Sequence, residues 1–87
     1  MTFEKPAYIL DARGLICPLP VLKARKILLG LNTGDVLQVM ATDPAVTVDF
    51  ALFCEESGHV MMTATAENGV FFIRLRRGMM PAETKAQ

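Results

Sequence analysis

The stretch Gly14-Leu15-Ile16-Cys17-Pro18-Leu19-Pro20 decides how the first helix of this chain begins. Pro18 suits the first helical position, because the amide proton that proline lacks would find no partner inside the helix. Cys17 is therefore predicted to be the N-cap residue. A sulfur atom there faces the first-turn amides and the positive end of the helix dipole, which favour the thiolate and lower the thiol pKa.

The residues around Cys17 are predicted to shape this sulfur site. Pro20 removes a second amide from the first turn, so Leu19 and Val21 are the expected donors near the sulfur. Gly14 permits either a positive φ angle or a close approach by another segment. The residues predicted to form the motif and stabilise the sulfur are Gly14, Pro18, Leu19, Pro20 and Val21.

Outward from this stretch, apolar spacing predicts two strands joined by a helix. Residues 7–10 form a short apolar run that predicts a strand, and residues 18–29 have apolar side chains at helical spacing. Gly30 is expected to end this helix. Residues 35–41 are rich in strand-forming residues, so the unit is a βαβ unit with parallel strands.

The second half predicts one more helix and a hairpin. Asp43 and Pro44 suit the N-cap and first position of a helix that Ser57-Gly58 ends. Residues 59–66 and 70–76 predict two strands, and the Asn68-Gly69 pair between them is a strong hairpin signal. The predicted fold class is α/β: a two-layer βαβαββ sandwich with a mixed four-stranded sheet and both helices on one face. Residues 1–87 are expected to form one domain, with a core at 7–76 and a flexible tail at 77–87.

Composition excludes several classes of function. The 87 residues are 52% hydrophobic, and nine Lys plus Arg balance nine Asp plus Glu, so no basic field favours direct nucleic-acid binding. No apolar run approaches the ~20 residues of a membrane span, and the first residues lack a signal-peptide pattern, so the cytoplasm is the expected compartment. Two cysteines and one histidine predict neither a disulfide framework nor a metal site.

The Cys17-Pro18-Leu19-Pro20 sequence resembles the Cys-Pro-x-Pro motif of the TusA/SirA-like sulfur carrier family. The approach to the motif, at Asp11, Arg13, Gly14 and Leu15, is also similar to that family. Further similar positions are Gly34-Asp35, Thr42-Asp43-Pro44, Phe53-Cys54 and Gly58-His59. The resemblance covers roughly residues 8 to 76.

The resemblance implies a function for Cys17. The matching cysteine of the family carries sulfur as a persulfide, received from a donor such as a cysteine desulfurase or a rhodanese-like protein and passed to a sulfur-accepting protein. Family pathways include tRNA thiolation, molybdenum cofactor assembly and sulfur oxidation. The chain is therefore expected to be a persulfide-relay sulfurtransferase or carrier rather than a self-contained turnover enzyme, with no cofactor beyond the covalent sulfur on Cys17.

Other side chains have a structural and a functional interpretation. Asp11 and Arg13 are expected to fix the approach to Cys17 as an ion pair or hydrogen-bond partners. Lys23, Arg25 and Lys26 form a solvated helix face or a partner-binding surface. Cys54 lies on the apolar side of its helix, which favours a core thiol over a resolving cysteine.

Two further functions remain open on the sequence. A non-catalytic regulatory or interaction module of the same fold would not need Cys17. A thiol redox sensor would pair Cys17 with Cys54, which requires their Cα atoms to lie within ~7 Å.

Overall fold

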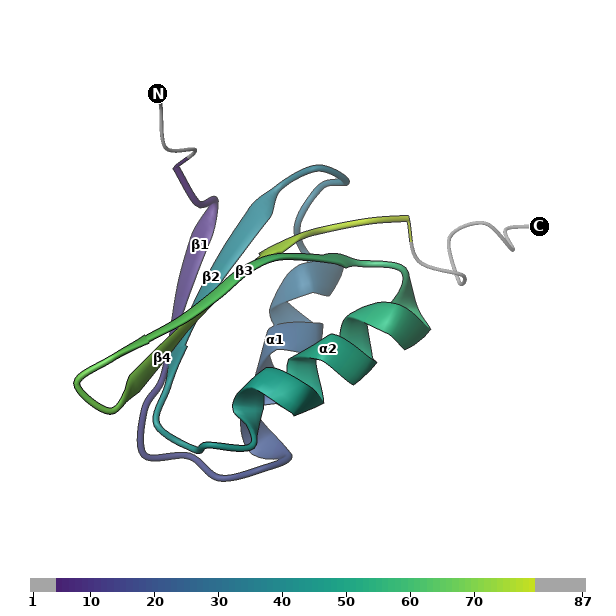
Figure 1. Ribbon diagram of the computed structural model, residues 1–87. Coiled ribbons are helices and arrows are strands. Elements are labelled where there is room, and N and C mark those ends of the chain that lie inside the picture. The colour runs from purple at the N-terminus through teal and green to yellow at the C-terminus, as the bar shows by residue number, and fades with distance from the viewer. Residues whose placement is uncertain (1–4, 80–87) are drawn as a thin grey trace.

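Six elements follow one another in the predicted order βαβαββ in the computed structural model, which describes residues 5–79 (Figure 1). The strands are β1 (Tyr8–Ala12), β2 (Val36–Ala41), β3 (Val60–Glu67) and β4 (Val70–Arg76), and the helices are α1 (Leu19–Leu29) and α2 (Val46–Ser57). The sheet order is β1-β2-β4-β3. β1 and β2 are parallel, as predicted, and the other two pairs are antiparallel.

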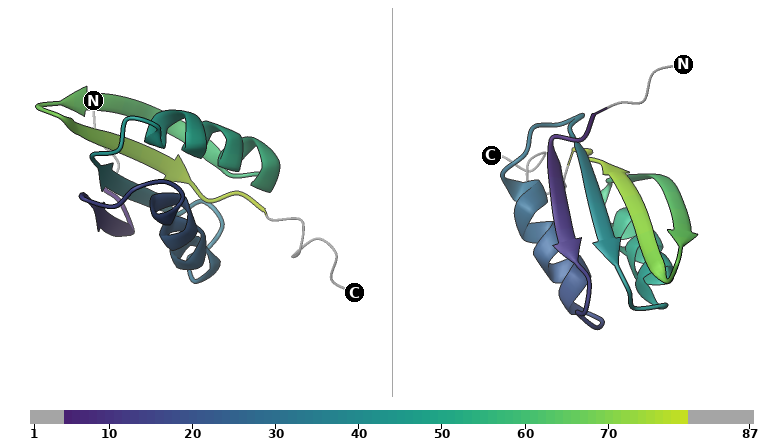
Figure 2. Two further views of the ribbon diagram at one scale, coloured as in Figure 1. Left: turned by 90° about the horizontal axis from the view of Figure 1, so that it is seen from below. Right: turned by 90° about the vertical axis from the view of Figure 1, so that its left-hand side faces the viewer.

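Both helices lie on one face of the sheet, which confirms the predicted two-layer sandwich. Figure 2 shows the strands in front of α1 and α2 in its right-hand view. The opposite face of the sheet is covered by no element of residues 5–79. The two layers place the starts of α1 and α2 at the same end of the molecule, next to the loops that follow β1 and β2 (Figure 1).

The core lies between the sheet and the two helices. In each helix the buried residues recur every four positions, at 20, 24 and 28 in α1 and at 46, 50 and 54 in α2, so each helix buries one face. The central strands β2 and β4 supply buried side chains on the other side of the core. The buried core cluster consists of Ala12, Ala24, Leu28, Leu37, Val39, Ala41, Val46, Phe50, Cys54, Ile73 and Leu75.

The predicted hairpin joins β3 to β4. Asn68 and Gly69 both have positive φ angles, 52° and 80°, which is the geometry that a tight two-residue hairpin turn requires. In β4 the side chains of Ile73 and Leu75 face the helices, as the alternation predicts. Arg74 faces the opposite side and yet is buried, because it lies against the neighbouring strands and donates a 2.8 Å hydrogen bond to Gln38.

Both helices begin later than the sequence predicts. The N-cap of α1 is Pro18 rather than Cys17, and the N-cap of α2 is Ala45 rather than Asp43. Neither helix has a side-chain cap hydrogen bond. The Cys17–Pro18 peptide bond is cis. Cys17 therefore lies in the loop before α1, one residue outside the predicted position.

The predicted tail at 77–87 also needs correction at its start. Arg77 is buried, and its Nε donates a 2.7 Å hydrogen bond to the Leu28 carbonyl at the end of α1. The amide of Gly78 donates to Nδ1 of the buried His59 at 3.0 Å. These two residues therefore belong to the packed domain. Residues 80–87 of the predicted tail lie outside the described residues.

Candidate functional site

The loop that carries Cys17 is attached to the loop after β2 by two hydrogen bonds. The Gly14 amide donates to Thr42 Oγ1 at 2.9 Å, and the Cys17 amide donates to Asp43 Oδ2 at 2.7 Å. Because β1 and β2 are parallel, their carboxyl ends meet at one edge of the sheet, and so do the loops that follow them. This topology brings two distant segments together at the cysteine.

Gly14 is required for its backbone angle. Its φ angle is 84°, and a Cβ atom added there would contact nothing within 4 Å. The sequence leaves open a positive φ angle or a close approach by another segment, and the structure shows the first. Glycine adopts this left-handed conformation without the steric cost that other residues pay.

Asp43 links the cysteine loop to the start of α2. Its Oδ1 accepts a hydrogen bond from the Ala45 amide at 3.0 Å, while its Oδ2 holds the Cys17 amide. The bonds from Ala45 and Cys17 hold the pKa of the Asp43 carboxyl below its ordinary value. The sequence predicts Asp43 as a helix cap but not as a hydrogen-bond partner of Cys17, because that contact depends on the tertiary arrangement.

The helix start does not lower the thiol pKa as predicted. The Leu19 amide, one of the two expected donors to the sulfur, instead donates to the Ile16 carbonyl at 2.9 Å. Pro18 and Pro20 have no amide proton to offer. The pKa of the Cys17 thiol is raised instead, chiefly by the Asp49 carboxylate, to which the protonated thiol can donate, and further through partial desolvation and the nearby charges of Asp49 and Asp43.

Cys17 lines a groove between α1 and α2 with a volume of about 320 Å³. The groove has apolar walls and three charged side chains, one basic and two acidic. Its lining residues are Cys17, Pro18, Val21 and Arg25 on the α1 side and Asp49, Leu52, Phe53 and Glu56 on the α2 side. The α2 residues of this wall were not predicted as site residues, because the sequence does not show which faces of the two helices meet.

Asp11 and Arg13 form the predicted ion pair in the cysteine loop. Arg13 Nε donates to Asp11 Oδ1 and Arg13 Nη2 to Oδ2, both at 2.8 Å, and the Arg13 amide adds a bond of 3.1 Å. The guanidinium hydrogen bonds, followed by the amide bond, lower the pKa of Asp11 to about 2. The pair is exposed and links the end of β1 to the residue before Gly14.

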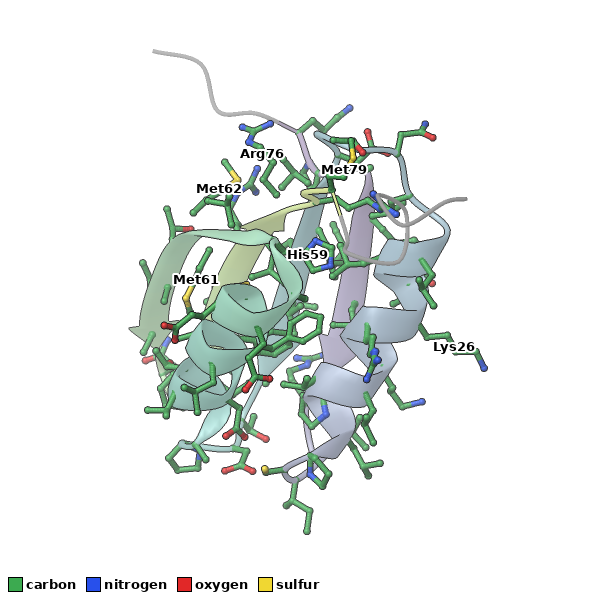
Figure 3. The ribbon with its side chains drawn as sticks, turned by 90° about the vertical axis from the view of Figure 1, so that its right-hand side faces the viewer. Lys26, His59, Met61, Met62, Arg76 and Met79 are labelled. Carbon is green, nitrogen blue, oxygen red and sulfur yellow. The ribbon has the colours of Figure 1, made fainter. Side chains whose placement is uncertain are left out.

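The three basic residues predicted as a partner surface lie on different sides of α1. Arg25 faces the groove with Cys17. Lys23 and Lys26 instead line a hollow beside Tyr8 and Leu10 of β1. Figure 3 shows Lys26 extending away from α2. Of the three, only Arg25 is placed beside the cysteine.

The second cysteine belongs to the core. Cys54 is 6% exposed, and burial raises its pKa to about 11, so its thiolate is disfavoured. This agrees with the prediction of a core thiol. Within residues 5–79 no group of His, Cys, Asp and Glu side chains is arranged to hold a metal ion, and no helix is long and apolar enough to cross a membrane.

Several exposed apolar side chains lie on the cysteine loop and on the two helices that flank the groove. Ile16 is 69% exposed, and Leu19 and Leu22 on α1 and Val48 and Leu52 on α2 are also exposed. Scattered exposed apolar residues are common on proteins, but Ile16 directly precedes the exposed thiol in the chain, and Leu52 lines the same groove as Cys17. The arrangement gives Cys17 an accessible sulfur on a surface that another protein can cover.

Comparison with known proteins gives the same family by sequence and by structure. Residues 8–77 match the family model described as sulfurtransferase TusA. The chain is 43% identical to the sulfur carrier protein TusA of Allochromatium vinosum over 68 residues, which cover 78% of this chain and 90% of that protein. It is 50% identical over 62 residues to a Neisseria meningitidis protein described as a candidate sulfur carrier, covering 71% of this chain and 84% of that one.

A solved structure supports the same relationship. The crystal structure of a SirA-like protein from Desulfitobacterium hafniense superposes with a TM-score of 0.73 at 27% sequence identity. The match covers 83% of this chain and 99% of the other. The family model spans all six described elements and the groove that holds Cys17. The chain belongs to the TusA family of sulfur carrier proteins.

Proposed function

We propose that this chain accepts sulfane sulfur as a persulfide on Cys17 and passes it to an acceptor protein. The observation that carries the proposal is the placement of Cys17, an exposed thiol in a groove between two helices. The second thiol is buried in the core. Membership of a family of sulfur carriers supports this use of the exposed cysteine.

The transfer step needs no chemistry beyond thiol exchange. The Cys17 thiolate attacks the outer sulfur of a persulfide on a donor protein, such as a cysteine desulfurase or a rhodanese-like protein. The sulfur–sulfur bond of the donor breaks as a new one forms to Cys17 Sγ. The donor cysteine leaves as a thiolate and takes up the proton that Cys17 released. The same exchange in the opposite direction loads the acceptor protein.

The groove suits a carrier that meets several proteins in turn. Its apolar walls, with Leu52 and Phe53 on α2, offer surface that a partner can bury, and Arg25 offers a charge for orientation. The proposal places this relay in the cytoplasm, where a reducing environment keeps Cys17 available as a thiol. It requires no cofactor apart from the carried sulfur.

Intact mass spectrometry tests the proposal. The protein is incubated with a cysteine desulfurase and cysteine, and its mass is expected to increase by one sulfur atom. The Cys17→Ser variant should lack this adduct, and the Cys54→Ala variant should retain it as the matched control. An unmodified wild-type chain, or an adduct that survives Cys17→Ser, would overturn the proposal.

The same variants test the alternative of a non-catalytic interaction module. The exposed side chains of Ile9 and Val60, on strands at the two edges of the sheet, give this alternative a physical basis. An interaction module would keep its cellular function after Cys17→Ser, whereas a carrier would lose it. Complementation of a deletion strain with each variant distinguishes the two functions.

A further inference from the structure

The outer edge of β1 has no neighbouring strand in the described part of the chain. β1 comes first in the sheet order β1-β2-β4-β3, so only β2 pairs with it among residues 5–79. Its register with β2 is regular from Tyr8 to Ala12. β3 is the other edge strand, but its register with β4 shifts between Met61 and Thr63, and such an irregularity protects an edge from further pairing. β1 is therefore the edge that is better able to accept another strand.

A hollow of about 220 Å³ lies next to this edge, between β1 and α1. Tyr8 and Leu10 line it from the strand, and Lys23, Lys26 and Ile27 line it from the helix. Figure 2 shows α1 beside β1 at this margin of the sheet, and Figure 3 shows Lys26 pointing outward from the helix. Leu10 and Ile27 are half-buried, whereas both lysines are exposed. The hollow thus combines apolar side chains with two accessible positive charges.

The charges along this edge are predominantly basic. None of the residues that line the hollow is acidic, and Lys5, which precedes β1, is also exposed. Asp11 is the acidic residue of β1, and its charge is offset by an ion pair with Arg13 at 2.8 Å. The chain as a whole carries nine acidic and nine basic residues, so the excess of positive charge is a local property of this surface. Such a surface attracts an acidic partner.

We propose that the edge of β1 and this hollow bind an extended acidic segment of a partner protein, which adds to the sheet as a strand beside β1. The main chain of such a segment pairs with the strand edge, and its alternate side chains point towards α1. Lys23 and Lys26 are three positions apart on the helix, which places their Cβ atoms about 5–6 Å from each other. Alternate side chains of a strand repeat every ~6.5 Å. Two acidic side chains at alternate positions can therefore meet both lysines.

This surface is separate from the groove that holds Cys17. Arg25 lines that groove, whereas Lys23 and Lys26 line the hollow on another side of α1. The proposal therefore does not depend on sulfur transfer. A segment bound along β1 leaves the groove open, so one protein can hold the chain while the exposed thiol meets another.

A designed peptide tests the proposal. The probe is a fluorescein-labelled peptide in which glutamate and valine alternate. One control peptide has the same composition with the glutamates and valines in separate blocks, and a second has lysine in place of glutamate. Fluorescence anisotropy gives the Kd for wild type, Lys26→Gln, Lys23→Gln/Lys26→Gln, Arg25→Gln and Cys17→Ser. Arg25→Gln is the matched control for Lys26→Gln, because it removes one positive charge from α1 outside the hollow.

The alternating acidic peptide should bind wild type and Cys17→Ser equally. Lys23→Gln/Lys26→Gln should raise the Kd about three- to tenfold, as expected for the loss of two exposed ion pairs, with Lys26→Gln between it and wild type. Arg25→Gln should change the Kd by less than about twofold. The block peptide should bind more weakly than the alternating one, and the lysine peptide should not bind. An unchanged Kd in the double lysine variant, or equal binding of the two acidic peptides, would overturn the proposal.

Nuclear magnetic resonance locates the bound peptide. Amides of β1 should exchange more slowly with solvent when the peptide is bound, and chemical shifts should change in β1 and at positions 23–27 of α1. Shift changes confined to the groove between α1 and α2 would refute the site. Sedimentation of the free protein provides a further check, because a dimer with protected β1 amides would show that a second copy of the chain occupies the edge instead. Peptide binding without any sulfur adduct in the desulfurase assay would refute the carrier function alone.

Discussion

The hydrogen bonds of Asp43 make the stability of the folded chain depend on pH. Its two carboxylate oxygens hold the amides of Ala45 and Cys17, and these bonds lower its pKa in the folded chain. At acidic pH the unfolded chain therefore binds a proton at this residue before the folded chain does. The resulting stabilisation is fully present above the ordinary carboxyl pKa and is lost as the pH falls through the folded value.

Asp43→Asn should remove this pH-dependent stabilisation. We expect the variant to melt at a lower temperature than wild type at pH 7, because asparagine has one uncharged acceptor oxygen in place of the two carboxylate oxygens that hold the two backbone N–H groups. The difference should shrink as the pH falls from 5 towards 2, and thermal unfolding followed by circular dichroism measures it. Glu55→Gln, an exposed change on α2, serves as the control. A difference that stays constant with pH would contradict the explanation.

The two cysteines should differ sharply in reactivity. Cys17 is exposed, whereas Cys54 is buried and its pKa is raised to about 11 by desolvation. N-ethylmaleimide at neutral pH should modify Cys17 alone in the folded chain and both residues in denaturant, as counted by intact mass. Rapid modification of Cys54 in the folded chain would show that α2 opens and would revive a redox role for that thiol.

At the scale of elements, the end of β4 is packed tightly against the end of α2. A Cβ atom at Gly78 would overlap the carbonyl group of Gly58, which is backbone and cannot rotate away. Gly58 itself ends α2 in the left-handed conformation. Figure 3 shows His59, whose Nδ1 accepts a hydrogen bond from the Gly78 amide, beside the segment that carries Met79. Glycine at position 78 allows these two segments to touch.

Gly78→Ala is therefore expected to destabilise the fold by about 1–3 kcal/mol, the usual cost of forcing extra atoms into a packed region. Gly30→Ala is the matched control. Gly30 has a negative φ angle of −94°, and an added Cβ would make only an ordinary contact with the Ile27 carbonyl. Urea unfolding measures both variants. Equal stability of Gly78→Ala and wild type would contradict the close packing.

The elements themselves could be predicted from the sequence because local patterns specify them. The spacing of Val46, Phe50 and Cys54 predicts a helix with one buried face, and the Asn68-Gly69 pair predicts the hairpin. The first residues of the helices were predicted less accurately than the elements themselves. Asp43 has the chemistry of an N-cap, but in the structure one of its carboxylate oxygens accepts a hydrogen bond from the amide of Cys17, which lies in the loop before α1.

Some residues of the candidate site could likewise be predicted from the sequence, and others could not. The sequence motif identifies Cys17, and the approach through Asp11 and Arg13 follows from residues two positions apart. Asp49 could not be identified from the sequence, because it lines the same groove as Cys17 only when α1 and α2 pack side by side. The predicted decrease of the thiol pKa was wrong for that reason. The prediction considered only the helix start, which lowers a thiol pKa, whereas the Asp49 carboxylate on the other helix raises the pKa of Cys17.

At the scale of the whole molecule, the central strands of the sheet are buried, whereas Cys17 lies in a loop beyond the end of an edge strand. β2 and β4 are paired on both sides, and their inward side chains, including Val39 and Ile73, are fully buried. β1 and β3 are edge strands with one neighbour each. Cys17 lies beyond the carboxyl end of β1, where its amide donates a hydrogen bond to Asp43 in the loop after β2.

This division predicts a pattern of amide hydrogen exchange. Amides of β2 and β4 should exchange most slowly, because they are released only when the sheet opens globally, whereas β3 should exchange faster as an exposed edge strand. Mass spectrometry of proteolytic peptides measures the exchange of each strand, and equal protection of β3 and β4 would contradict the pattern.

Asp43→Asn should accelerate exchange at the Cys17 amide, which donates to Asp43 in the wild type, and leave the exchange of β4 unchanged under conditions where the variant remains folded. Such a local change would show that the cysteine loop can move while the core stays closed, as a carrier that presents one sulfur to different partners requires.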